Sequence, residues 1–172
     1  MEATEVLSQL LNQNREMIEK ALDGLTEEEL YKQPSDQCNS IAWLTWHIAR
    51  AQDGLISGIQ QSPELWTEQG WNEKFGMSED ESGYQHGPEQ MASFRAPSID
   101  DLKAYWDASN EKASNYITSL KPEDLDRQVP SMMGEGTTPL ATYLGITVNE
   151  ALVHGGQIAY LRGLHRGMGW YF

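Results

Sequence analysis

Residues 140–165 read LATYLGITVNEALVHGGQIAYLRGLH, and the periodicity of this stretch decides the fold. Its inward-facing positions recur at alternating spacings of four and three residues, which is the seam of a helix packed in a bundle. These positions are Leu140, Leu144, Thr147, Ala151, His154, Ile158 and Leu161. We therefore expect a long helix that is capped by Thr137 or Thr138, has Pro139 in its first turn and ends near His165.

Three further segments have apolar side chains at helical spacing, and each begins near a residue that can cap a helix. A short helical turn is also expected after Thr26, because Glu29 follows it at the spacing of a capping box. The three long segments cover residues 4–23, residues 39–59 with a start at Asn39 or Ser40, and residues 98–120 with a start at Ser98.

Residues 60–98 differ in composition from the helical segments, with scattered glycines, tryptophans and acids. They are expected to form a long, loop-rich crossover between the second and third long helices. We find no strand-like alternation and no internal repeat in the chain. The sequence therefore predicts one all-α domain over residues 1–172, a four-helix bundle with a long crossover.

The net charge is −14, from 26 acidic and 12 basic residues. Such a field repels phosphate backbones and anionic lipid surfaces, so we expect neither a nucleic-acid nor a membrane partner. No apolar run approaches the roughly 20 residues that cross a bilayer, and the N-terminus lacks the apolar region of a secretory signal. The single cysteine, Cys38, can form no intrachain disulfide. We expect a cytoplasmic protein.

Glu150 and His154 lie four residues apart, about 40° around a helix, so both can point to one place on the bundle axis. His47 lies three residues after Leu44, on or beside the inward face of the second long helix. Two imidazoles and one carboxylate form the ligand set of an open site for zinc or a similar divalent ion. Alternatively, each histidine is an isolated hydrogen-bonded core residue and Glu150 reaches water. The spacing alone leaves both interpretations open.

Three segments resemble the landmarks of the DinB/YfiT superfamily, in the order typical of that family. They are LTEEEL at 25–30, NSIAWLTWHIARAQDG at 39–54 and NEALVHGGQIAYLRGL at 149–164. Many members have three histidines at the metal, the last two as His-x-x-x-His, whereas Glu150 takes the first of these places here. This His–Glu–His order is similar to the branch that contains mycothiol-dependent maleylpyruvate isomerase.

The resemblance implies a metal-binding four-helix bundle in which His47, Glu150 and His154 hold zinc or nickel. It also implies a metal-dependent enzyme that acts on a small molecule, most simply a transferase or isomerase that uses a low-molecular-weight thiol. A metal-dependent hydrolase and a non-catalytic, metal-stabilised binding module are the alternatives. A homodimer is common among similar proteins, although the sequence leaves the oligomeric state open.

Four further residues are candidates for the mouth of a substrate pocket. Trp43 and Trp46 flank His47, and Tyr143 precedes Glu150 on the last helix. Arg162 could anchor an acidic group, although an ion pair on the helix surface is the plainer expectation.

Three other residues with reactive side chains are not expected to be ligands or nucleophiles. His86 lies in the crossover and is expected to be a solvated loop residue. His165 suits the negative end of the last helix dipole, and Cys38 is expected to be a small, half-buried filler.

Overall fold

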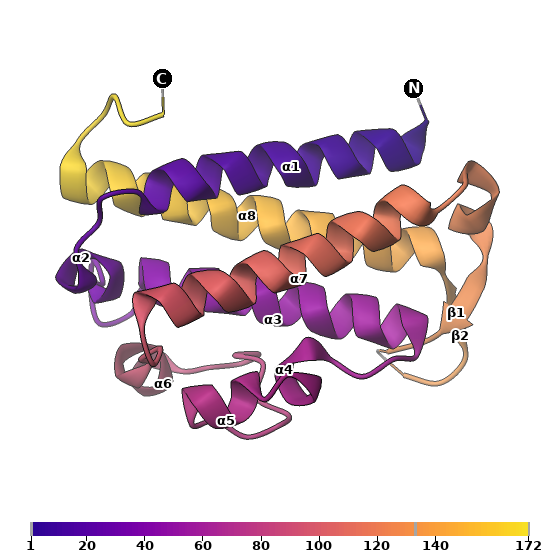
Figure 1. The fold of residues 1–172 in the computed structure, drawn as a ribbon, viewed down its shortest axis with the longest axis horizontal. Helices are drawn as coiled ribbons and strands as arrows, with labels where there is room; N and C mark the ends of the chain where they lie inside the picture. The colour runs from indigo at the N-terminus through magenta and orange to yellow at the C-terminus, as the bar shows by residue number, and fades with distance from the viewer. Residues whose placement is uncertain (1, 133, 172) are drawn as a thin grey trace.

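Four helices of 20 residues or more frame the part of the chain that the computed structural model describes, residues 2–132 and 134–171 (Figure 1). These long helices are α1 (Ala3–Leu22), α3 (Ile41–Gln60), α7 (Ile99–Ser119) and α8 (Leu140–Arg166). The shorter elements are α2 (Glu27–Tyr31), α4 (Leu65–Glu68), α5 (Trp71–Phe75), α6 (Pro88–Ser93), the 3-10 helix η1 (Pro122–Asp126), β1 (Gln128–Pro130) and β2 (Thr137–Pro139). The expected all-α bundle is confirmed.

The long helices pack in a closed cycle, because α1 and α3 each contact both α7 and α8. In Figure 1, α1 and α8 run in one direction while α3 and α7 run in the other. Two helices that follow each other in sequence and run parallel need a connection as long as the bundle. The crossover between α3 and α7 is that connection.

Several helices begin at residues whose side chains can accept hydrogen bonds from the free backbone N–H groups of the first turn. Ser40 is the N-cap of α3, where its Oγ accepts from Trp43 N at 3.2 Å. Ser98 does the same for α7. Thr26 and Glu29 form the expected capping box at α2. These local signals confirm the predicted starts.

The start of α8 differs from the prediction. Thr137 and Pro139 belong to β2, which pairs antiparallel with β1, and Leu140 is the first helical residue. The predicted threonine cap for α8 was therefore wrong, and the short β1–β2 hairpin is an addition to the all-α bundle that the sequence did not indicate. The hairpin has three residues in each strand, too few to show alternation in the sequence.

The bundle interior is lined by apolar side chains from all four long helices. Ile18, Ile48, Trp106 and Ile158 are each no more than 2% exposed. No helix in the described ranges is both long enough and apolar enough to cross a membrane.

The crossover is anchored to α3 by a carboxylate that has no contact with water. Asp53 is 0% exposed and accepts from the backbone N–H groups of Leu65 and Trp66 at 2.9 and 2.8 Å. Its oxygens also accept from Lys112 Nζ at 3.0 Å and from the Tyr105 hydroxyl at 3.2 Å. Because a buried charge requires partners, these bonds fix the start of α4 against α3 and α7.

Arg50 fixes a second part of the crossover one turn earlier on α3. It is 4% exposed, and its Nε donates to the Glu81 carbonyl at 2.7 Å. Its guanidinium also pairs with Glu64 at 2.8 Å and lies 4.8 Å from the ring centre of Trp66. Two buried charges of α3 therefore hold both ends of residues 64–81.

Helices α1 and α8 are in tight contact at a glycine. Asn14 of α1 is 8% exposed and its Nδ2 donates to the Ala151 carbonyl at 2.9 Å. A Cβ on Gly155 would lie 2.1 Å from Asn14 Oδ1 and 2.9 Å from its Cγ. A Cβ on the adjacent Gly156 would meet nothing within 4 Å. The first glycine is therefore required by packing, whereas the second is not.

Gly155→Ala should destabilise the protein by about 1–3 kcal/mol, because the new methyl group forces Asn14 out of its place. Gly156→Ala is the matched control and should stabilise the protein by about 0.5–1 kcal/mol through helix propensity alone. Urea unfolding followed by circular dichroism measures both. In an Asn14→Ala background Gly155→Ala should lose its penalty, and equal effects of the two glycine changes in the wild type would contradict this interpretation.

Asp53→Asn should cost about 3–5 kcal/mol, because it removes the buried negative charge that lies 3.0 Å from Lys112 and 3.6 Å from Arg50. Asp107→Asn removes an exposed partner of Arg15 and should cost at most about 1 kcal/mol. Hydrogen exchange should show faster exchange of the Leu65 and Trp66 amides in Asp53→Asn only. Unchanged protection of these two amides would show that Asp53 does not anchor the crossover.

Candidate metal centre

His47, Glu150 and His154 meet between the antiparallel helices α3 and α8. Each offers one ligand atom, and the three atoms lie within 4.8 Å of one another. Glu150 Oε2 is 3.2 Å from His154 Nε2 and 3.9 Å from His47 Nε2. The two imidazole ring centres are 5.2 Å apart, with the rings nearly perpendicular. The structure therefore brings together the three residues that the spacing singled out.

The cluster lies at the edge of the bundle and not at its centre. The side chains of His47, His154 and Glu150 are 14%, 17% and 33% exposed. The histidines are therefore largely covered, while one side of the carboxylate reaches solvent. A small molecule has access to the cluster from that side.

Each histidine is oriented by a bond to its second ring nitrogen. His47 Nδ1 lies 2.8 Å from the Ser82 carbonyl, and His154 Nδ1 lies 2.7 Å from Gln157 Oε1. Both partners are oxygen acceptors, and an Nδ1–H donated to each of them leaves Nε2 available to bind an ion between the imidazoles and Glu150. Such bonds are the usual outer partners of histidine ligands.

The electrostatic surroundings favour the neutral form of His47. Burial lowers the pKa of its imidazole below the ordinary value, and the nearby His154 lowers it further. The Ser82 carbonyl and Glu150 oppose this lowering only in part. A neutral imidazole is the form that binds metal.

The donor set fits a divalent ion. Zinc is bound by imidazole nitrogen and carboxylate oxygen at about 2.0–2.2 Å, which places neighbouring donors of a tetrahedral site about 3.3 Å apart. The shorter separations in the cluster, 3.2 and 3.9 Å, are close to this value. The three donors, all within 4.8 Å of one another, therefore suit zinc or a similar ion once side-chain rotation brings the imidazoles closer together, and nitrogen and oxygen donors also suit nickel.

The crossover covers the cluster at Gly83. Its φ of +77° is left-handed, and a Cβ there would lie 2.7 Å from the Trp46 ring, 2.9 Å from His47 Nδ1 and 3.1 Å from the Trp43 ring. Trp43 in turn stacks on His47, with ring centres 4.7 Å apart. Only glycine allows the loop to approach closely enough for the Ser82 carbonyl to reach His47.

His86 is a buried support of this cover, and the expectation of a solvated loop residue was wrong. Its side chain is 8% exposed, and its Nδ1 accepts from Trp43 Nε1 at 3.1 Å. Its Nε2 then carries the hydrogen and donates to Glu81 at 2.9 Å. Burial alone would raise the pKa of Glu81, but bonds from Gly83, His86 and Ser82 outweigh it and lower that pKa. Little in the sequence indicated this role, because it depends on hydrogen bonds from His86 to Trp43 and Glu81 in other segments.

The four residues predicted for a pocket mouth are all largely buried. Trp43, Trp46, Tyr143 and Arg162 are 5%, 0%, 2% and 9% exposed. The two tryptophans pack behind His47 and beneath the crossover, as described above. A cavity of about 780 Å³ lies beside the cluster on α8 and is lined in part by Gln157. None of these four residues contributes to its lining.

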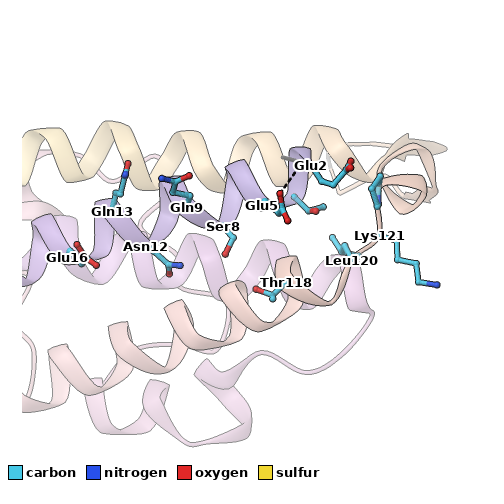
Figure 2. Close-up of a pocket in the computed structure, with 12 residues that line it drawn as sticks. Glu2, Glu5, Ser8, Gln9, Asn12, Gln13, Glu16, Thr118, Leu120 and Lys121 are labelled. Atoms are coloured by element: carbon cyan, nitrogen blue, oxygen red, sulfur yellow. Dashed lines mark hydrogen bonds between the residues drawn. The ribbon is translucent and has the colours of Figure 1, made fainter.

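A second concavity of about 790 Å³ lies between α1 and the end of α7 and includes none of the cluster residues (Figure 2). The residues lining it are Glu2, Thr4, Glu5, Ser8, Gln9, Asn12, Gln13, Glu16, Thr118, Leu120, Lys121 and Pro122. Six of its twelve lining residues are amides or acids, and no histidine or cysteine is among them. We therefore assign no chemistry to this surface.

The chain is similar to known proteins over nearly its whole length. The model of the DinB superfamily matches residues 10–158. A crystal structure of a conserved protein from Enterococcus faecalis is 29% identical, with a TM-score of 0.85 over 98% of this chain and 99% of that one. A search of the curated proteins finds no match.

Gly83→Ala should lower the affinity for zinc about 10- to 100-fold, because moving the loop removes the Ser82 bond that orients His47. Gly70→Ala is the control: Gly70 has a similar φ of +70°, but a Cβ there meets nothing within 4 Å. Competition with a chromophoric chelator measures both affinities. The role given to Ser82 would be refuted by equal losses in the two variants.

Proposed function

The chain belongs to the DinB superfamily, whose members generally bind metal, and we propose that it is an enzyme dependent on a divalent metal ion. The ion would be zinc or nickel, held by His47, Glu150 and His154. The single observation that carries the proposal is the convergence of their ligand atoms to within 4.8 Å from two helices. No other cluster of this kind occurs among the residues that the structure describes.

Three protein ligands support a catalytic site over a purely structural one. Structural zinc sites are closed by four protein ligands, whereas catalytic sites keep a position for water or substrate. The exposed side of Glu150 supports such an open position, since its side chain is 33% exposed. The alternative of a metal that only stabilises the bundle requires a fourth protein ligand.

The reaction we propose is thiol transfer or a thiol-assisted isomerisation. A bound divalent ion lowers the pKa of a thiol and supplies a thiolate nucleophile at neutral pH. The same ion would also activate water, so the metal alone does not separate thiol transfer from hydrolysis. The His–Glu–His order of the cluster, which resembles the thiol-dependent branch of the superfamily, favours the thiol reaction over the hydrolase.

In this reaction the surrounding protein residues would orient the imidazoles and exclude water. Ser82 and Gln157 hold the two imidazoles so that both Nε2 atoms face one point. Trp43 and Gly83 seal the inner side of His47 from water. The exposed part of the cluster is therefore the side formed by Glu150 and His154, where a substrate can approach.

Protein purified without added metal should contain one zinc or nickel ion per chain by elemental analysis. His154→Ala should lose this ion. Loss of an outer partner lowers metal affinity about 10- to 100-fold, and loss of a ligand itself should lower it further. His165→Ala, a histidine on the same helix outside the cluster, should keep its metal. A metal-free wild type, or metal retained by His154→Ala, would contradict the proposed centre.

The open position can be tested with cobalt in place of the native ion. Addition of 2-mercaptoethanol to the cobalt protein should produce a thiolate-to-cobalt charge-transfer band in the near ultraviolet. A spectrum that is unchanged at saturating thiol would show a closed site and support the stabilising role instead.

A further inference from the structure

An apolar groove runs beside the cluster, between α8, the start of α3, α6 and the connection before α3. Its volume is about 780 Å³. The residues lining it are Pro34, Gln37, Cys38, Asn39, Leu44, Met91, Val153, Gly156, Gln157, Tyr160, Leu161 and Leu164. The groove is thus built from four segments that are distant in sequence.

The groove and the cluster share one face of α8. Gln157 lines the groove, and its Oε1 holds His154 at 2.7 Å. It follows Glu150 by seven residues, which is two turns and about 10 Å along the helix. On α3, Leu44 lies one turn before His47. A molecule lying in the groove therefore points one end toward the cluster.

The lining carries no formal charge. It contains no aspartate, glutamate, lysine, arginine or histidine. Leu44 and Leu161 are buried at its floor, 1% and 5% exposed, while Tyr160 and Leu164 at its rim are 68% and 54% exposed. Its polar groups are mainly neutral amides such as Gln37. Arg162, the base next to Leu161, is not part of the lining.

We infer that this groove holds the body of the substrate, and that this body is uncharged and largely apolar. The inference rests on the proposed function, since it places the reacting group of that molecule at the cluster. Transfer of an anionic group into the groove would leave it without a counter-charge, in a protein whose net charge is −14. An uncharged apolar body instead gains from covering the exposed rim.

The size of the groove favours a small molecule over a second copy of the chain. Cavities that bind small molecules have volumes of about 300–1,000 Å³, and the groove lies within this range. A stable protein interface needs about 800 Å² from each partner, which is commonly flat and has a polar rim. The contact of Gln157 with both the groove and His154 also points to the cluster as the other end of the site.

Two fluorescent probes with the same aromatic frame test the charge preference. N-phenyl-1-naphthylamine is uncharged, and 8-anilinonaphthalene-1-sulfonate carries a sulfonate. In chelator-treated, metal-free protein the uncharged probe should bind at one site per chain. The sulfonate should bind about tenfold more weakly or worse, because its charge would be desolvated without a partner. Equal or tighter binding of the sulfonate would overturn the inference.

Gly156→Leu tests the location. A side chain there enters the groove, and its Cβ meets nothing within 4 Å, so the helix tolerates it. It should weaken the uncharged probe about tenfold or more by filling the space. Gly145→Leu is the matched control, since Gly145 is on the same helix, is exposed and open, and lies outside the groove. Equal probe affinity in the two variants would overturn the assignment.

Two further readouts separate the possible failures. Gly156→Leu should keep the metal content of the wild type, because it leaves His47, Glu150 and His154 in place. If the wild type holds no metal but the probe results stand, the proposed function fails while the groove remains a binding site for apolar molecules. If sedimentation shows a wild-type dimer that Gly156→Leu dissociates, a second copy covers the groove and the substrate assignment is wrong.

Discussion

Asp53 has a charge and no access to water, and much of the structure follows from how that charge is satisfied. Its oxygens take two backbone N–H groups of α4, so the crossover must return to α3 immediately after leaving it. Arg50 then donates to the Glu81 carbonyl. This bond fixes the backbone of the next residue, Ser82, whose carbonyl contacts His47. The orientation of one imidazole thus depends on two buried charged side chains of the same helix, less than two turns away.

The frame of the fold could be predicted from local patterns. Capping and helical periodicity involve neighbours within one or two turns. The sequence therefore predicts the caps Ser40 and Ser98 and the inward-facing positions of residues 140–161. The expected superfamily is confirmed by the match over residues 10–158. The same periodicity placed His47, Glu150 and His154 on facing helices, and the structure brings them together.

What could not be predicted depends on contacts between distant segments. His86 reads as a loop residue until Trp43 and Glu81 are known to flank it. The hairpin of β1 and β2 is too short to show a pattern of alternation. The groove combines four segments, and no residue type in them indicates a binding site by itself. Arg162 was a candidate anchor for an acidic group, with a surface ion pair as the plainer expectation, but it is only 9% exposed and does not line the groove.

The order of the cluster residues along the chain has a consequence for biosynthesis. His47 is made early, but Glu150 and His154 follow about a hundred residues later, on the last helix. At about 5–20 residues per second, translation needs on the order of ten seconds to cover that interval. The inner face of α3 is therefore synthesised before its partner helix, and the three side chains can come together only after residues 150–154 have left the ribosome.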